Sequence, residues 1–374
     1  YIPTTVACAR GNRVAAMVSC SRANFGGDVV VDIPGMPAGL TIQAQVMTAN
    51  LTSVPVLFSA AADAPTAGAL VELHGKTTDP KLGVQGVFAQ RTMLVRGQNN
   101  RDVYGHDARR MAIGVTAEVP FTIEIVQPKV PIVRTGSMGL KVVAKRVGDF
   151  KAPISVTMLY NPPGIGSSGS ISIPEGQSEA IIPLTANGGA GIGKWPIVVR
   201  GRAAHGGGTV EVATQLAELE VADSYLNLAF QKTAGELGKE TSLVVKVERK
   251  GDFPEVADIQ LLGLPANTST VSEPLKVGKE TNELIFPIKI AENATPNTYK
   301  SLVCQATIVR EGEPITMTVG SGELRVDRPP PPKPNAPATP AVAAAAPAEP
   351  AEKPARPLSR LEQLRLQKQQ QSGK

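Results

Sequence analysis

Apolar and polar residues alternate in short runs along most of the chain up to Asp327, and glycine and proline separate the runs. The stretch Phe121 to Val126 (F-T-I-E-I-V) shows the alternation most clearly. A period of two residues indicates a β-strand with one buried face, and no stretch in this region has the period of a helix. The pattern therefore predicts an all-β protein. The main strands are expected at residues 14–22, 28–33, 54–60, 69–75, 87–95, 112–118, 121–126, 139–146, 154–159, 170–173, 180–184, 195–199, 215–221, 226–230, 241–248, 259–262, 283–290, 299–310 and 323–326.

A set of spaced residues occurs three times. In each copy a strand ends in arginine and a phenylalanine follows closely. A proline then lies at one fixed spacing from the phenylalanine, and a further residue of an apolar run lies at a second, longer fixed spacing. Constant spacings of this kind are the signature of a repeated domain. The three sets are Arg22, Phe25, Pro37 and Phe58; Arg146, Phe150, Pro162 and Pro183; and Arg249, Phe253, Pro265 and Phe286.

Seven or so short strands in about 100 residues, with frequent turn signals, are typical of an immunoglobulin-like β-sandwich. We therefore expect three tandem sandwiches, at residues 1–120, 121–221 and 222–327. An up-and-down barrel is the alternative, but it would not recur as three compact units. Because the chain starts at Tyr1 and enters strand pattern almost at once, we expect it to be the C-terminal part of a longer protein, with its first sandwich truncated.

The composition changes after Asp327. Residues 328–357 contain 11 prolines and 10 alanines, which predicts a disordered, extended linker. Residues 358–371 follow as a short amphipathic helix, for which Ser359 and Glu362 form a capping box. A solubilising tail without structure is the alternative. The candidate docking residues of this helix are Leu358, Leu361 and Leu364, flanked by Arg360 and Arg365.

The net charge of +5 lies entirely in this tail. Residues 328–374 contain 8 Lys and Arg against 3 Asp and Glu, so the chain up to Asp327 contains 30 of each sign. A nucleic-acid-binding domain would show a basic face with aromatic residues to stack on bases, so we do not expect the folded body to bind nucleic acid. No apolar run reaches the ~20 residues that a membrane-spanning helix needs.

Three cysteines cannot form a disulfide framework. Cys20 and Cys304 share the alternation phase of apolar neighbours and are expected in the core. A tight hairpin turn at residues 10–13 would place Cys8 opposite residue 15, so a bond between Cys8 and Cys20 is not expected.

Residues that carry enzyme chemistry are scarce, and we predict no catalytic residue and no cofactor. Gly164 to Gly169 matches the G-x-G-x-x-G letters, but a strand-like run follows it where a helix is required, so we expect a flexible loop between strands. His106, beside Asp107 and near Asp102, is the best acid–base candidate. However, adjacent residues on a strand point to opposite faces, which places Asp107 poorly as a partner.

Metal ligands are equally sparse. Asp149 and Asp252 are weak candidates for calcium, because both lie in the repeated sequence Gly-Asp-Phe. A turn that leads into a buried phenylalanine explains the same repetition and is favoured. The expected binding loop is the extra segment of the first unit at residues 98–110, whose candidate residues are Asn99, Asn100, Arg101, Asp102, Tyr104, His106 and Asp107.

The chain also resembles a known group of proteins. The end of the body (Glu323 to Asp327) runs into a proline-rich stretch and then the P-L-S-R-L-E motif of residues 357–362. Together with residues 121–131, 135–138 and 264–267, these are similar to the C-terminal region of large secreted bacterial proteins that carry pre-peptidase C-terminal domains, which are often labelled subtilase-type serine proteases. The resemblance implies export and tandem immunoglobulin-like domains, and it transfers no catalytic residue to this sequence.

Two functions from different classes follow. The first is a non-catalytic secreted or cell-surface protein, in which the sandwiches act as a spacer or adhesion rod and bind a protein or polysaccharide partner. The alternative is a set of accessory domains of a larger secreted hydrolase whose catalytic domain lies ahead of residue 1.

Overall fold

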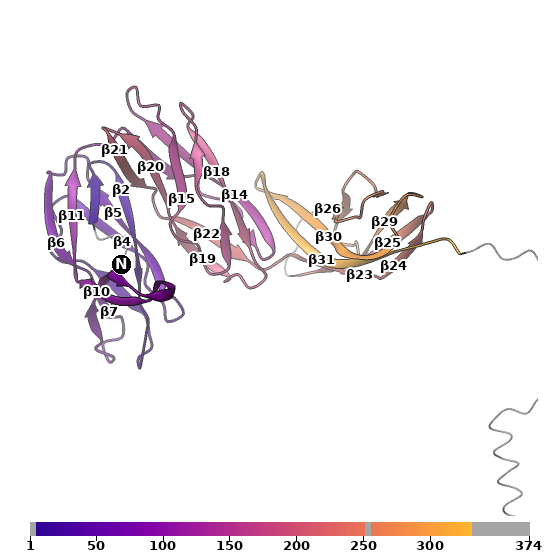
Figure 1. The fold of residues 1–374 in the computed structure, drawn as a ribbon, viewed down its shortest axis with the longest axis horizontal. Coiled ribbons are helices and arrows are strands. Elements are labelled where there is room, and N and C mark those ends of the chain that lie inside the picture. Colours follow the sequence, from indigo (N-terminus) through magenta and orange to yellow (C-terminus); the bar gives the residue numbers. More distant parts are fainter. Residues whose placement is uncertain (1–4, 251–255, 331–374) are drawn as a thin grey trace, which may run out of the picture. The chain divides into compact units, whose positions relative to one another are not determined.

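The computed structural model describes residues 5–250 and 256–330 (Figure 1). This part of the chain consists of β-strands and their connections, with one short 3-10 helix, so the predicted all-β class is confirmed. Within these residues no helix is long and apolar enough to cross a membrane. The predicted linker, apart from residues 328–330, and the predicted C-terminal helix with Leu358, Arg360, Leu361, Leu364 and Arg365 lie outside the described residues.

The strand pairings fall into three successive groups, which we call the first, second and third segments. Every ladder stays within one segment except a two-residue pairing between the second and third. The first segment contains β1 (Thr5–Ala9), β2 (Arg13–Ser19), β3 (Val29–Asp32), β4 (Leu40–Ala44), β5 (Ser53–Ala60), β6 (Ala67–Glu72), β7 (His74–Thr77), β8 (Gln85–Val87), β9 (Gln90–Arg96), η1 (Gln98–Asn100), β10 (Asp102–Ala108) and β11 (Arg110–Thr116).

The second segment has the strand order of an immunoglobulin-like sandwich. One sheet has the order β12-β14-β18-β16, a second has the order β17-β15-β20-β21, and a third, shorter one has the order β13-β22-β19. The first two orders correspond to A-B-E-D and to C-F-G with β17 as an added edge strand beside C. The strands are β12 (Phe121–Ile125), β13 (Ile132–Val133), β14 (Gly136–Arg146), β15 (Ile154–Met158), β16 (Ile165–Ser167), β17 (Ile171–Ile173), β18 (Glu179–Ala186), β19 (Gly193–Ile197), β20 (Val199–His205), β21 (Gly208–Ala213) and β22 (Ala217–Ala222).

The third segment repeats this arrangement. Its sheets have the orders β23-β25-β29-β27 and β28-β26-β30-β31, and β24 runs parallel to β31 as β13 does to β22. The strands are β23 (Leu226–Phe230), β24 (Thr233–Glu236), β25 (Glu240–Arg249), β26 (Ala257–Leu262), β27 (Thr268–Ser269), β28 (Leu275–Val277), β29 (Glu283–Ile290), β30 (Asn297–Arg310) and β31 (Glu313–Asp327).

The first segment follows the same plan, but its described residues include no strand equivalent to β12 and β23. Its B, E and D strands are β2, β5 and β4, and its last strand β11 pairs with β6 and, in parallel, with β1. In the described part of the chain, β2 pairs only with β5, whereas β14 and β25 each also pair with a preceding strand. The predicted hairpin at residues 10–13 is therefore wrong, because β1 and β2 belong to different sheets. All three cysteines are free.

Alternating side chains of the facing sheets form the cores. In the second segment Ile123, Leu140 and Ile182 come from one sheet, while Val156 and Val199 come from the other, and all are fully buried or nearly so. Trp195 also belongs to this core. Burial of such aliphatic side chains stabilises a fold by ~1.5–3 kcal/mol each, so these cores hold together without many aromatic residues.

The three arginines of the repeat have the same structural role. Each lies at or just beyond the end of strand B and donates hydrogen bonds to main-chain carbonyls of the loop that enters strand E, and Arg22 and Arg146 each also donate to one carbonyl of the loop that follows strand B. We call them the capping arginines. The acceptors are the carbonyls of Gly27, Met47, Thr48 and Leu51 for Arg22; of Ala152, Pro174 and Gln177 for Arg146; and of Gly278 and Thr281 for Arg249.

The three prolines of the repeat also correspond in structure. Each proline carbonyl accepts a hydrogen bond from the main-chain N–H of the third residue after it. The second residue after the proline has a positive φ, as a type II turn requires. The turns lead into the D strands β4, β16 and β27. Their residues are Pro37, Gly39 (φ 77°) and Leu40; Pro162, Gly164 (φ 78°) and Ile165; and Pro265, Asn267 (φ 61°) and Thr268.

Two expectations from spacing are wrong. The last position of the repeated set is not equivalent in the three copies, because Phe58 and Phe286 are buried while Pro183 is exposed. Loops of different length between the strands shift the register. The G-x-G-x-x-G stretch is not a loop throughout, since Ile165–Ser167 form β16 and pair with β18, which leaves no helix N-terminus for a phosphate.

We expect replacement of Arg146 by alanine to lower the free energy of unfolding by ~2–3 kcal/mol, because three carbonyls at 2.6–3.2 Å lose a charged donor. Urea unfolding of the purified protein measures this change. Arg310→Ala, at an exposed strand end, is the control and should stay within ~0.5 kcal/mol of the wild type. Equal effects of the two substitutions would contradict a capping role for Arg146.

Candidate functional site

A β-hairpin interrupts the last strand of the first segment. β8 pairs with β7, and the Phe88 N–H still donates to the Leu73 carbonyl at 2.8 Å. The chain then leaves the sheet and returns at Arg110, which lies opposite Glu72. The residues between, which form β9 and β10, make a separate two-stranded sheet. In the second and third segments the equivalent strand carries no such insertion.

The expected loop at residues 98–110 is therefore wrong in its second half. Only the turn around Asn99 and Asn100, both with positive φ, connects the strands, and Asp102–Ala108 form β10. Two register shifts around Tyr104 break the alternation in this strand, which is why the sequence pattern missed it. The candidate residues Asp102, Tyr104, His106 and Asp107 thus lie on a strand.

Arg91 holds the two strands of the hairpin together. Its guanidinium donates to the Asp102 carboxylate and to Asp107 at 3.1 Å, and these hydrogen bonds, the one to Asp102 first, raise the pKa of Arg91. The guanidinium lies over Gly105, where an added Cβ would be 3.1 Å from its central carbon. Arg101 is exposed at the turn, beside Arg96, which donates to Asn100 at 3.0 Å.

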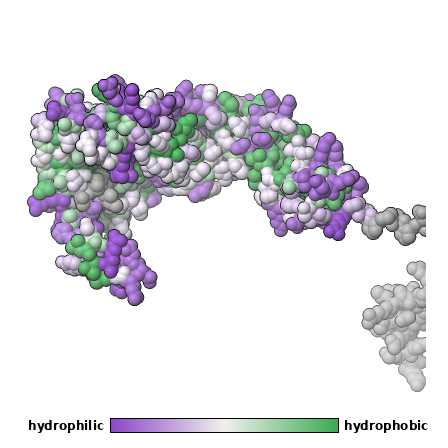
Figure 2. All heavy atoms as spheres, turned by 45° about the horizontal axis from the view of Figure 1, so that its top comes forward, coloured by the Kyte–Doolittle hydropathy of each residue, from purple (hydrophilic) through white to green (hydrophobic). Residues whose placement is uncertain are grey.

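The hairpin exposes an unusual share of apolar surface. Leu94 and Val103 are 60% exposed, Tyr104 is 64% exposed, and Val95 is half-exposed. Residues 89–110 also contain five arginines, no lysine and two aspartates. Tyrosine and arginine are enriched at protein–protein interfaces, while lysine is depleted. On the face that Figure 2 shows, green hydrophobic patches lie among purple hydrophilic residues.

The residues considered for catalysis and for metal do not assemble into a site. His106 lies opposite Thr92 and is exposed, while the neighbouring Asp107 binds Arg91, so Asp107 does not orient the imidazole. Asp149 is exposed, and Asp252 lies outside the described residues. Across residues 5–250 and 256–330, no group of three His, Cys, Asp or Glu side chains could hold a metal ion.

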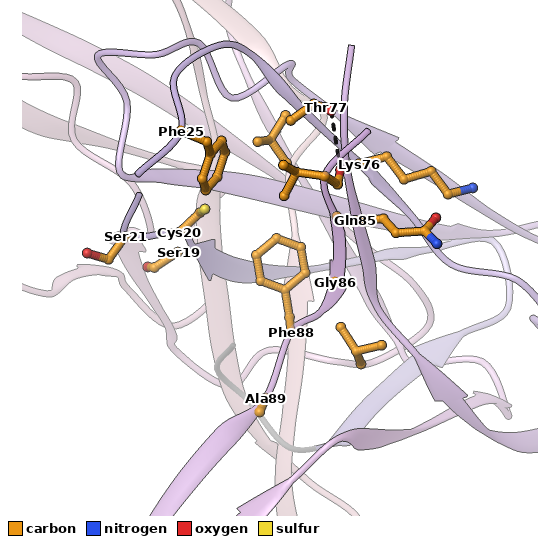
Figure 3. A pocket seen from close by; sticks show the side chains of 14 residues that line it. Ser19, Cys20, Ser21, Phe25, Lys76, Thr77, Gln85, Gly86, Phe88 and Ala89 are labelled. Atoms are coloured by element: carbon orange, nitrogen blue, oxygen red, sulfur yellow. Dashed lines mark hydrogen bonds between the residues drawn. The ribbon is translucent and has the colours of Figure 1, made fainter. Parts of the chain in front are cut away.

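A cavity of about 360 Å³ lies at the base of the hairpin (Figure 3). Its wall includes Cys20, Phe25, Gly75 and Phe88, and the view shows the Cys20 sulfur between the two phenyl rings. The sequence missed this cavity, because residues far apart in the chain form it. The expectation that Cys20 is buried in the core is wrong, since its side chain is half-buried in the cavity wall.

The other two thiols are in the core. Burial raises the pKa of Cys8 to about 11 and that of Cys304 to about 12, so both stay protonated at neutral pH. A protonated, enclosed thiol is a poor nucleophile. Cys20 is therefore the thiol that a reagent in solution reaches first.

No protein-family model matches the chain, and no characterised protein matches it in sequence. Several solved structures match at low identity. A protein of unknown function from Porphyromonas gingivalis W83 is 10% identical, with 55% of this chain and 100% of that chain covered and a TM-score of 0.20. Salmonella alpha-2-macroglobulin is 13% identical, with 87% of this chain and 30% of that chain covered and a TM-score of 0.26.

The fibronectin(III)-like modules of Clostridium thermocellum CbhA are 10% identical, with 55% of this chain and 94% of theirs covered and a TM-score of 0.20. At such identities and TM-scores these likenesses carry no argument about activity or partners. The function has to be argued from the surfaces of this chain.

We expect a thiol reagent at pH 8 to label one cysteine of the native protein, Cys20, because burial keeps Cys8 and Cys304 protonated and enclosed. Mass spectrometry of the digested protein identifies the labelled site. Unfolding in urea should expose all three thiols, and native Cys20→Ser should take up no label. Fast labelling of Cys8 or Cys304 in the native protein would contradict the structure.

Proposed function

We propose that the chain is a non-catalytic binding and spacer protein, built from three immunoglobulin-like domains at residues 1–120, 121–221 and 222–327, that acts outside the cell or at its surface. The hairpin β9–β10 contacts the partner, which is a protein or a polysaccharide with an acidic surface. The resemblance to the C-terminal regions of secreted bacterial proteins supports export. An accessory role beside the catalytic domain of a larger hydrolase remains the alternative.

The hairpin is the observation that carries this proposal. Its apolar side chains are exposed, and five arginines against two aspartates give it a surplus of positive charge. The ion pairs of Arg91 fix the hairpin before a partner arrives, which reduces the entropy lost on binding. A positively charged surface attracts acidic partners, and salt weakens that attraction.

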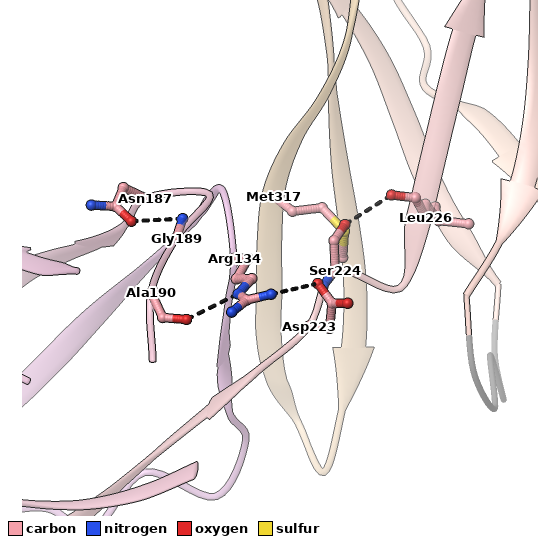
Figure 4. Close-up of polar contacts among 8 residues, drawn as sticks. All are labelled: Arg134, Asn187, Gly189, Ala190, Asp223, Ser224, Leu226 and Met317. Atoms are coloured by element: carbon pink, nitrogen blue, oxygen red, sulfur yellow. Dashed lines mark hydrogen bonds and ion pairs between the residues drawn. The ribbon is translucent and has the colours of Figure 1, made fainter. Parts of the chain in front are cut away.

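The connection between the second and third segments supports the spacer role (Figure 4). The Arg134 guanidinium donates to the Ala190 carbonyl at 2.9 Å and lies 3.9 Å from the Asp223 carboxylate. Val130 and Val133, which precede β14, are buried in the core of the third segment. Ladder contacts and shared apolar burial resist bending more than a short flexible linker does.

A short pairing between β14 and β31 also joins the second and third segments at this connection. Gly136 lies opposite Met317, and the Thr318 N–H donates to the Thr135 carbonyl at 2.9 Å. Thr135 has a φ of 61°, which is unfavourable for a β-branched residue and is held by the surrounding contacts.

The test compares two matched pairs of exposed residues. Residues 1–327 are screened against arrays of acidic and neutral polysaccharides and a panel of purified surface proteins. We expect Leu94→Ser with Tyr104→Ser to weaken the binding that is found by at least about tenfold, because both side chains lie in the proposed contact. Binding should also weaken as salt rises.

Leu70→Ser with Val309→Ser is the control, because these side chains are as exposed (64% and 58%) but lie on β6 and β30, away from the hairpin. The proposal fails if the wild type binds nothing in either screen, or if the hairpin and control variants lose affinity equally.

A further inference from the structure

The outer face of the sheet β23-β25-β29-β27 in the third segment carries exposed apolar side chains. Along β25 and β29 the outward positions alternate with buried ones. Ile285 is 54% exposed, Pro287 is exposed, and Val244 lies opposite Ile285 on the neighbouring strand and is half-buried. Ser242, a small residue, lies opposite Pro287. We call these four residues the outer patch.

The same positions can be located in the first segment through its ladders. The turn residues Leu40 and Thr268 are equivalent, and their partners on strand E fix the correspondence between β5 and β29. The matching residues, first segment before third, are Ala60 and Ile290, Leu57 and Pro287, and Pro55 and Ile285 on strand E, and Ala15 and Ser242, and Met17 and Val244 on strand B.

In the first segment this outer face is covered. Pro55 and Leu57 are buried, although both point away from the core of their own sandwich. Leu57 and Ala15 cluster with Val198 and Ala213, which belong to the second segment. The outer face of strands B and E is therefore a surface on which this chain already packs another immunoglobulin-like domain.

Charged residues border the outer patch at both of its ends. Glu240 lies opposite Lys289, and their side chains form an ion pair at 3.0 Å. At the other end Lys246 lies opposite Glu283. All four residues are exposed. Each strand thus presents one charge of each sign at the border of the patch, and the signs on β25 are opposite to those on β29.

This arrangement is complementary to itself. When two copies of the face meet about a two-fold axis parallel to the strands, β25 of each copy lies over β29 of the other. The residues that then face each other between the copies are Glu240 and Lys289, Lys246 and Glu283, and Val244 and Ile285. A symmetric contact between identical surfaces requires such self-complementarity, and every pair in it occurs twice.

The second segment differs at the centre of the same face. Its Ile181 has the position of Ile285 on strand E and is 59% exposed. However, the residue opposite is Lys141, which forms an ion pair with Glu179 at 2.7 Å. A charge therefore lies where the third segment has Val244, and a second copy packed there would have to displace water from it.

We propose that the outer patch of the third segment is an interface between two copies of this chain. The two third segments pack face to face, with the apolar side chains at the centre and the charged residues aligning the copies at both ends. The hairpin β9–β10 belongs to the first segment, so a dimer offers two hairpins to a partner and gains avidity. This surface is separate from the one in the proposed function, so the inference stands if the hairpin binds nothing.

Sedimentation velocity of the full chain over a range of concentrations measures the association. We expect a reversible equilibrium between monomer and dimer with a Kd below about 1 mM. Ile285→Ser should weaken the dimer at least about tenfold, because the side chain is removed twice from the interface. Ile181→Ser is the matched control and should leave the equilibrium unchanged, since it removes an equally exposed isoleucine at the same position of strand E. Thermal unfolding shows that both variants fold.

A charge exchange tests the alignment of the two copies. Lys289→Glu places glutamates opposite each other and should weaken the dimer at least about fivefold. Adding Glu240→Lys should restore the wild-type affinity, because opposite charges then face each other again within each copy and between the copies.

The proposal is wrong if the chain stays monomeric up to about 1 mM. It is also wrong if Ile285→Ser dimerises as tightly as the wild type, or if Ile181→Ser loses as much affinity as Ile285→Ser. Failure of the charge-exchanged variant to regain affinity would contradict the face-to-face alignment.

Discussion

The hydrogen bonds of the capping arginines are the interaction on which the arrangement of each segment depends. A sandwich has to close the end at which strand B leaves the sheet and the chain returns to strand E. Several main-chain carbonyls of that return loop, among them those of Thr48, Leu51 and Gln177, accept hydrogen bonds from the arginine. Arg22 donates to three carbonyls of this loop and to that of Gly27, and Arg146 donates to two and to that of Ala152. A hydrogen bond from a charged donor contributes about 1.5–3 kcal/mol, so one side chain that makes several of them fixes the loop and the neighbouring strands together.

The same reasoning explains why the repeat could be read from the sequence. Arginine, proline and the residue with positive φ each meet a local geometric requirement that few other residues meet, so they recur wherever the geometry recurs. Alternation likewise predicted the all-β class, because it reflects the burial of one strand face. The residue at the last position of the set, Phe58 or Pro183, meets no such requirement, and its position depends on loop length. The residues at this position therefore do not occupy equivalent places on strand E in the three segments.

What the sequence could not provide is pairing between distant strands. Most of β9 was expected as a strand, but β10 was expected as part of a loop, because its register shifts disturb the alternation on which strand prediction rests. The position of Cys20 was misjudged for a related reason. Its alternation phase is that of a core residue, as expected, but the strand that would cover it is absent from the described part of the chain. Alternation reveals which face is buried and does not reveal whether the neighbouring strand exists.

The inserted hairpin and the open edge of β2 are connected through Phe88. Its ring lies 3.1 Å from the position that a Cβ on Gly75 would occupy, so it packs where Ile123 packs against Gly201 in the second segment. Phe88 thus fills part of the space left by the absent strand, and the rest is the cavity. The same residue is the last one before the hairpin leaves the sheet. Phe88 therefore joins the wall of the cavity to the start of the inserted hairpin.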